Sequence, residues 1–169
     1  MDNIRVEAPL TKAAARSLRA GDSVLISGTI YTARDAAHKR MVESGEIPFD
    51  IQNAVIYYTG PAPAREGRVI GPCGPTTSGR MDAYAPVLIA KGMTAMIGKG
   101  ERNAEVINAM KEHTAVYFGA IGGAGALISK CVKSAEVIAY DDLGTEAVMR
   151  LEVVDFPAVV LIDSYGNSI

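Results

Sequence analysis

Short apolar segments alternate with amphipathic ones along the chain, which is the pattern of a layered α/β domain. Segments rich in β-branched residues predict strands at 4–9, 23–31, 54–59, 68–71, 93–97, 115–120, 135–140, 151–153 and 158–163. Helical spacing predicts helices at 12–18, 33–44, 80–91 with a kink or restart at Pro86, 104–113, 122–131 and 145–149. Thr32 is the expected N-cap of the second helix, and 68–71 the expected hairpin partner of 54–59. We therefore expect one α/β domain over residues 1–169, with a mixed sheet.

Composition narrows the classes of function. The 169 residues carry 17 Lys and Arg against 19 Asp and Glu, a net charge of −2 that excludes a strongly basic nucleic-acid binder. No segment has the pattern of a signal peptide or a membrane span, so we expect a cytoplasmic protein without a membrane partner. The two cysteines, Cys73 and Cys131, are too few for a disulfide framework or for a four-iron cluster.

Three loops that follow predicted strands carry side chains suited to an anion, at the sheet edge where α/β proteins bind ligands. In the first loop, Arg34 and His38 lie four residues apart near a helix start and could grip a carboxylate. The alternative is a solvated first turn with both side chains in water, and residue types alone favour this alternative.

The second loop has three consecutive hydroxyls (76–78) between glycines, followed by Arg80. It predicts either an anion site or a capping loop, and the two have equal weight. In the third, Lys99 lies between two glycines, so its ammonium either approaches a ligand or is solvated in a tight turn. Together, Arg34, Arg80 and Lys99 suggest a small polyanion such as a dicarboxylate. The glycines of 122–127 lack a dinucleotide-binding order and indicate close packing instead.

Four segments in this order resemble the C-terminal region of class I fumarases and the β subunit of the two-subunit forms, including L(+)-tartrate dehydratase. The segments are 27–29 with 32–40, 74–81, 98–100, and 156–158 with 163–167. The resemblance implies a swivelling β/β/α three-layer domain and an iron–sulfur hydro-lyase that hydrates fumarate reversibly to L-malate. A tartrate dehydratase, or one acting on another 2-hydroxy diacid, is the alternative within that chemistry. A non-catalytic anion-binding module is the alternative outside it.

In this family a companion half or subunit holds a [4Fe–4S] cluster with three cysteines. The resemblance therefore implies that this chain is a β subunit, with no metal ligand of its own, in an α2β2 assembly with a cluster-bearing α subunit. It assigns Arg34, Arg80 and Thr77 to the binding of a malate or fumarate substrate. The catalytic residues that it implies are His38, Thr76 and Lys99, with His38 either an acid/base or a group that orients Arg34. Cys73 departs from the pattern, because a small residue without a thiol is expected there.

Overall fold

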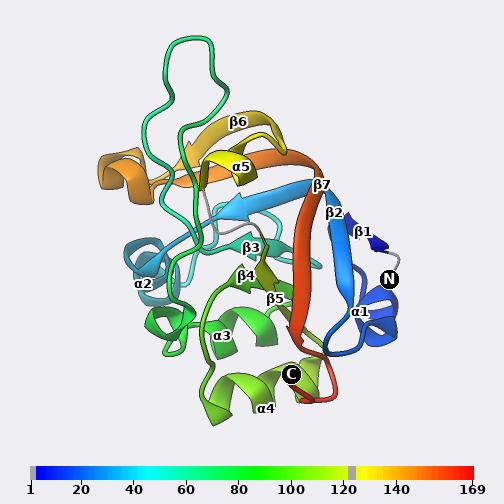
Figure 1. The fold of residues 1–169 in the computed structure, drawn as a ribbon. Coiled ribbons are helices and arrows are strands. Elements are labelled where there is room, and N and C mark those ends of the chain that lie inside the picture. Colours follow the sequence, from blue (N-terminus) through cyan, green and yellow to red (C-terminus); the bar gives the residue numbers. More distant parts are fainter. Residues whose placement is uncertain (1–2, 122–124) are drawn as a thin grey trace.

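Four parallel strands form the centre of the fold (Figure 1). In this computed structural model, which describes residues 3–121 and 125–169, they are neighbours in the order β2 (Ser23–Thr32), β3 (Val55–Tyr57), β4 (Ala95–Gly98) and β5 (Val116–Ala120). The strand β1 (Ile4–Ala8) adds a fifth parallel strand beside β2. Because β2 to β5 run in one direction, their carboxyl ends meet at one edge of the sheet.

Two antiparallel strands complete the sheet. The long strand β7 (Val148–Ile162) pairs with β2 on one side and with β5 near its own end. The sheet therefore closes on itself, because strand pairing runs from β2 through β3, β4, β5 and β7 and returns to β2. The strand β6 (Val132–Ala139) pairs with the first half of β7. The expected mixed α/β fold with a mixed sheet is confirmed.

Helices connect the strands. They are α1 (Lys12–Ser17), α2 (Asp35–Ser44), α3 (Ala85–Ala90), α4 (Ala104–His113), α5 (Gly125–Ser129) and the 3-10 helices η1 (Ser78–Met81) and η2 (Asp141–Glu146). The sequence explains several ends: the Thr11 hydroxyl accepts from the Ala14 amide at 3.2 Å, and Gly45 ends α2 with a positive φ of 74°. Among the helices of the described residues, none is long and apolar enough to cross a membrane.

Alternate residues of the central strands pack into two separate hydrophobic cores, one on each face of the sheet. Val55 and Tyr57 of β3 pack into the core enclosed with β1 and β7, whereas Ile56 packs into the core under α2, α3 and α4. The neighbouring strand repeats the pattern, with Ala95 and Ile97 in the first core and Met96 in the second. Burial on both faces explains why these strands are almost continuously apolar.

The predicted strands at 151–153 and 158–163 are parts of the single strand β7. A bulge divides the sequence pattern without ending the strand, because three steps along β7, from Val153 to Phe156, oppose two steps along β2. Asp155 takes the positive φ of 53° within that bulge. The prediction of a hairpin strand at 68–71 is wrong, since this segment belongs to a long loop.

Among the helix predictions, those for Thr32 and for 145–149 need correction. Thr32 is not a cap: it ends β2, its hydroxyl accepts from the Met149 amide at 3.2 Å, and Arg34 is the N-cap of α2. The expected restart at Pro86 is confirmed: the segment 80–91 divides into η1 and α3, with Pro86 in the first turn of the new helix. The segment 145–149 joins the end of η2 to β7. Of the helix predicted at 122–131, residues 122–124 lie outside the described residues, and α5 covers 125–129.

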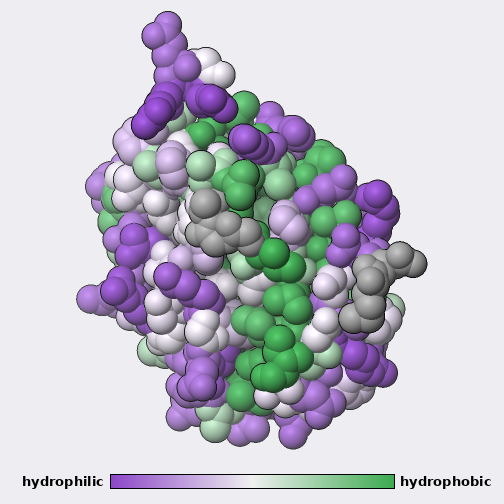
Figure 2. Space-filling model, viewed as in Figure 1, coloured by the Kyte–Doolittle hydropathy of each residue, from purple (hydrophilic) through white to green (hydrophobic). Residues whose placement is uncertain are grey.

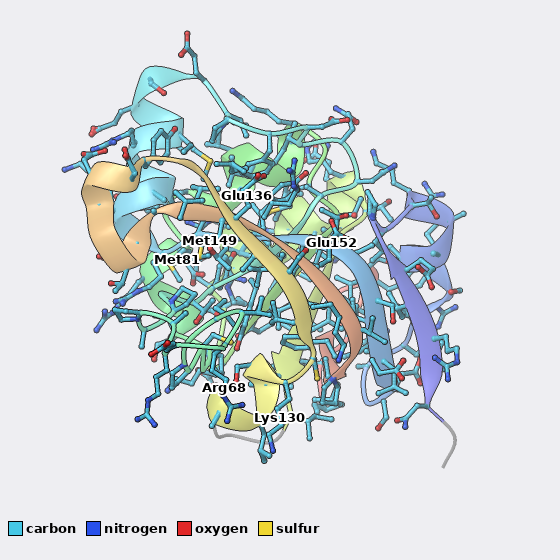
Figure 3. The ribbon with its side chains drawn as sticks, turned by 90° about the horizontal axis from the view of Figure 1, so that it is seen from above. Arg68, Met81, Lys130, Glu136, Met149 and Glu152 are labelled. Atoms are coloured by element: carbon cyan, nitrogen blue, oxygen red, sulfur yellow. The ribbon has the colours of Figure 1, made fainter. Side chains whose placement is uncertain are left out.

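The loop after β3 projects from the body of the molecule at the top of Figure 1, and residues 62–69 are all exposed. Arg68 of this loop lies near Lys130 (Figure 3), and the two line one hollow with Arg65.

An apolar strip runs down the face that carries β7 and the C-terminus, as Figure 2 shows. Such strips are typical of surfaces that bind other proteins.

Candidate active site

The three predicted loops all follow carboxyl ends of the parallel strands. The segment with Arg34 joins β2 to α2, the hydroxyl segment (76–78) ends the long loop after β3, and Lys99 follows β4. The expectation that these loops share one sheet edge is confirmed by the order of β2, β3 and β4.

Backbone hydrogen bonds fasten the hydroxyl segment to two strand ends. The Thr76 amide donates to the Tyr58 carbonyl at 2.7 Å, directly after β3. The Ser78 amide donates to the Lys99 carbonyl at 2.9 Å, and Thr77 forms a parallel bridge with Lys99. The structure thus brings Thr76, Thr77 and Lys99 together through main-chain contacts, so their relative positions do not depend on flexible side chains.

Arg34 lies at the N-terminus of α2, and its side chain is only 25% exposed. It crosses Gly60, where an added Cβ would lie 2.9 Å from Arg34 Cδ, so a larger residue would displace the arginine. Glu146 already supplies a carboxylate at this helix start, since it accepts from the Ala36 amide at 3.3 Å. Its oxygen lies 4.0 Å from Arg34 Nε, which has no hydrogen-bond partner among the described residues. Asp35 places a second carboxylate oxygen 3.9 Å from the same nitrogen, so the charge of the guanidinium is partly balanced although Nε makes no hydrogen bond.

His38 is completely buried, so the alternative in which it faces water is wrong. Its Nδ1 lies 2.8 Å from the Arg34 carbonyl, which fixes the neutral tautomer with the proton on Nδ1. Its ring meets Tyr58 edge to face at a centroid distance of 5.4 Å, and Nε2 has no partner among the described residues. Burial lowers the pKa of His38 from 6.5 to about 4, so the ring is uncharged at neutral pH.

Arg80 is placed differently from the other cations. It lies on η1 and is exposed, as are Thr77 and Lys99. Within residues 3–121 and 125–169, neither Arg80 nor Lys99 has a carboxylate oxygen within 4.0 Å. Both cations are therefore available to an external anion, although no described contact joins Arg80 to Arg34.

Cys73 and Cys131 are both free thiols. Cys73 is buried and its amide donates to the Gly125 carbonyl at 3.3 Å, while burial raises the pKa of its thiol to about 11. In the part of the chain that the structure describes, no three His, Cys, Asp or Glu residues are grouped to hold a metal ion. Gly125 also packs closely: an added Cβ would lie 2.5 Å from the Gly74 amide nitrogen.

Behind the edge lies a buried ion pair that residue patterns did not reveal. Arg102 Nε donates to Asp82 Oδ1 at 2.7 Å, and the Asn103 amide donates to the other carboxylate oxygen at 2.8 Å. The guanidinium lies between two tyrosine rings, 5.2 Å from the centroid of Tyr58 and 4.8 Å from that of Tyr117. Asp82 and Arg102 are twenty residues apart with no periodic relation, so the sequence carried no signal of their pairing.

Comparison with known proteins assigns the chain to a family. The model of the family described as Fumarase C-terminus matches residues 1–169. The chain is 44% identical over 148 residues to the aerobic class I fumarate hydratase of Escherichia coli K12, covering 84% of the chain and 27% of that protein. Fumarate hydratase 2 of Leishmania major is 41% identical over 153 residues, covering 87% of the chain and 27% of that enzyme.

A third relative is matched along most of its own length. It is a protein of Methanocaldococcus jannaschii named as an L(+)-tartrate dehydratase subunit beta, 38% identical over 170 residues, which cover 95% of the chain and 87% of the relative. By contrast, the chain spans about a quarter of the length of the fumarate hydratases above. On the match of the family model and these identities, the chain belongs to the fumarase C-terminus family.

Proposed function

We propose that this chain is the β subunit of an iron–sulfur hydro-lyase that interconverts fumarate and L-malate. One observation carries the proposal: Thr76, Thr77 and Lys99 are fastened together at the sheet edge that Arg34 also borders, in a chain 44% identical to a fumarate hydratase. We also propose that residues 1–169 form one swivelling β/β/α domain. This domain closes on a cluster-bearing α subunit in an α2β2 assembly. The exposed apolar strip on the β7 face supports a protein partner.

The cations of this chain would bind the two carboxylates of the substrate. Arg34 and Arg80 present planar forks suited to carboxylates, and Thr77 adds a hydroxyl donor. Removal of the proton from C3 builds negative charge on the neighbouring carboxylate. Lys99, held beside Thr77, is placed to stabilise that charge. The main chain that carries Thr76, Thr77 and Lys99 is held by hydrogen bonds before substrate arrives, so little rearrangement of the backbone opposes the reaction.

Thr76 is the proposed group at C3, with its hydroxyl acting alongside a carboxylate of the partner. A threonine hydroxyl alone is a weak base, so it needs that second group. We assign His38 to holding the Arg34 carbonyl rather than to proton transfer, because its ring is buried and its Nδ1 is engaged at 2.8 Å. Its uncharged state also avoids repulsion with the cations of the site.

The described residues do not fit an iron–sulfur cluster, since they offer no group of three ligands. In the proposed enzyme the [4Fe–4S] cluster belongs to the α subunit, where it would supply a Lewis acid for the substrate hydroxyl. This chain contributes binding, charge stabilisation and a proton-transfer hydroxyl, and none of its own steps depends on holding the cluster.

A tartrate dehydratase is the second candidate, favoured by the relative that this chain matches over 87% of its length. The deciding experiment purifies this chain with its cluster-bearing partner without oxygen and compares kcat/KM for fumarate, L-malate and L(+)-tartrate. The proposal predicts a preference for fumarate and malate. A preference for tartrate would favour the second candidate, and a loaded pair inactive on all three acids would favour a non-catalytic anion-binding module.

A further inference from the structure

Arg102 occupies an unusual position for a charged side chain. The side chain is 0% exposed, and its Nη2 donates to the Tyr58 hydroxyl at 3.2 Å in addition to the Asp82 bond. A buried ion pair costs much desolvation, and apolar residues of similar volume often stabilise a fold equally well. Its presence behind the proposed site therefore calls for a role other than general stability.

Each group around the guanidinium leads to a different part of the proposed site. Asp82 directly follows η1, the short helix that carries Arg80. Tyr58 contributes its ring to Arg102 and its carbonyl to the Thr76 amide at 2.7 Å. Arg102 thus links the arginine-bearing helix to the strand end that fixes Thr76.

Tyr117 forms the third link. Its hydroxyl lies 2.9 Å from the Gly100 carbonyl, to which it donates, and 2.7 Å from the buried Ser78 hydroxyl. Ser78 in turn donates its amide to the Lys99 carbonyl. Ser78 packs tightly against the lysine turn, because a Cβ added at Gly98 would lie 2.0 Å from Ser78 Oγ. The Tyr117 hydroxyl therefore joins the hydroxyl segment, at Ser78, to Gly100 on the far side of the lysine turn.

We propose that Arg102 and Tyr117 are positioning residues, which hold the Thr76–Arg80 segment and the Gly98–Gly100 turn in the geometry that the reaction requires. This inference rests on the proposed function of the site. Neither side chain needs to touch the substrate: each acts through the backbone of Thr76, Ser78 or Lys99. Misplacement of reacting groups by about 1 Å can cost about a hundredfold in rate, so such a network has a measurable effect on catalysis.

Tyr117→Phe tests the inference because it removes the hydroxyl and keeps the ring that packs on Arg102. Thr94→Val is the matched control: Thr94 is equally buried, its hydroxyl donates to the Leu10 carbonyl at 2.6 Å, and it lies before β4, at the opposite end from Lys99. Each variant removes one buried hydroxyl, that of Tyr117 with its contacts to Ser78 and Gly100 and that of Thr94 with its bond to Leu10. The two melting temperatures therefore measure how much of each effect is loss of stability. The readouts are kcat and KM of the complete enzyme, the melting temperature, and the amide NMR signals of the full chain.

We expect Tyr117→Phe to lower kcat by about tenfold or more, with KM changed by less than about threefold. Thr94→Val should keep the wild-type kcat despite a comparable fall in melting temperature. The amide signals of Thr76, Thr77 and Lys99 should shift only in Tyr117→Phe. An unchanged kcat in Tyr117→Phe, or equal losses in both variants, would overturn the inference. If the wild-type pair has no hydro-lyase activity, the proposed function fails, and the amide signals alone decide whether the network positions these residues.

Discussion

Replacement of Lys99 by methionine separates a catalytic lysine from a surface lysine. Methionine keeps an unbranched side chain and removes only the ammonium group. Lys99 is exposed, has no carboxylate within 4.0 Å among the described residues, and contacts Ser78 through its backbone carbonyl, which the substitution leaves in place. The expected change in the free energy of unfolding is therefore within about 0.5 kcal/mol, or about 1–2 °C in melting temperature.

The expected effect on catalysis is much larger. Loss of a charge that stabilises a developing carboxylate charge raises the barrier by about 2–4 kcal/mol, which lowers kcat/KM by about thirty- to a thousandfold. The assay measures kcat/KM of the complete enzyme with fumarate beside the melting temperature of this chain. Lys91→Met is the control, because Lys91 is also exposed but lies before β4, at the other end of the same strand. Equal kcat/KM in the Lys99 and Lys91 variants would refute the role of Lys99.

Three further predictions follow from the site. Arg80→Lys keeps the charge but loses the planar fork, so kcat/KM should fall by about ten- to a hundredfold, and a wild-type value would show that fork geometry is unimportant. The chain purified alone without oxygen should contain no stoichiometric iron and sulfide, which elemental analysis checks directly. His38 has a pKa of about 4 in the folded state and 6.5 when exposed, so the unfolded chain binds the proton first as the pH falls. Its contribution to stability is complete above about pH 6.5 and falls by up to about 1.4 kcal/mol per pH unit towards pH 4, and urea unfolding should show a shallower pH dependence in His38→Gln.

Capping residues and hydrophobic spacing predicted the helices whose ends depend on residues close by in the sequence. The helix predicted at 104–113 has those bounds, and the N-cap role of Thr11 follows from its own hydroxyl. The sequence did not predict that β7 closes the sheet, because the partners of β2 in β7 lie more than a hundred residues away. The bulge at Asp155 also broke the alternation on which strand prediction depends.

The exposed part of the site was easier to predict than its buried support. Glycines and hydroxyls marked the loops with Thr76 and Lys99, which the structure joins by main-chain bonds. The burial of His38 had one weak signal, since it lies one residue after Ala37 and three before Met41, both on the buried face of α2. The Glu146 contact at the start of α2 had none, because it depends on tertiary packing between distant segments.

The central claim is that this chain completes the active site of a cluster-bearing partner. The most direct measurement is the rate of fumarate hydration as the loaded partner, prepared without oxygen, is titrated with this chain. The account predicts no turnover by either protein alone and a rate that rises and saturates at one chain per partner. Full activity of the partner without this chain, or turnover by this chain alone, would contradict it.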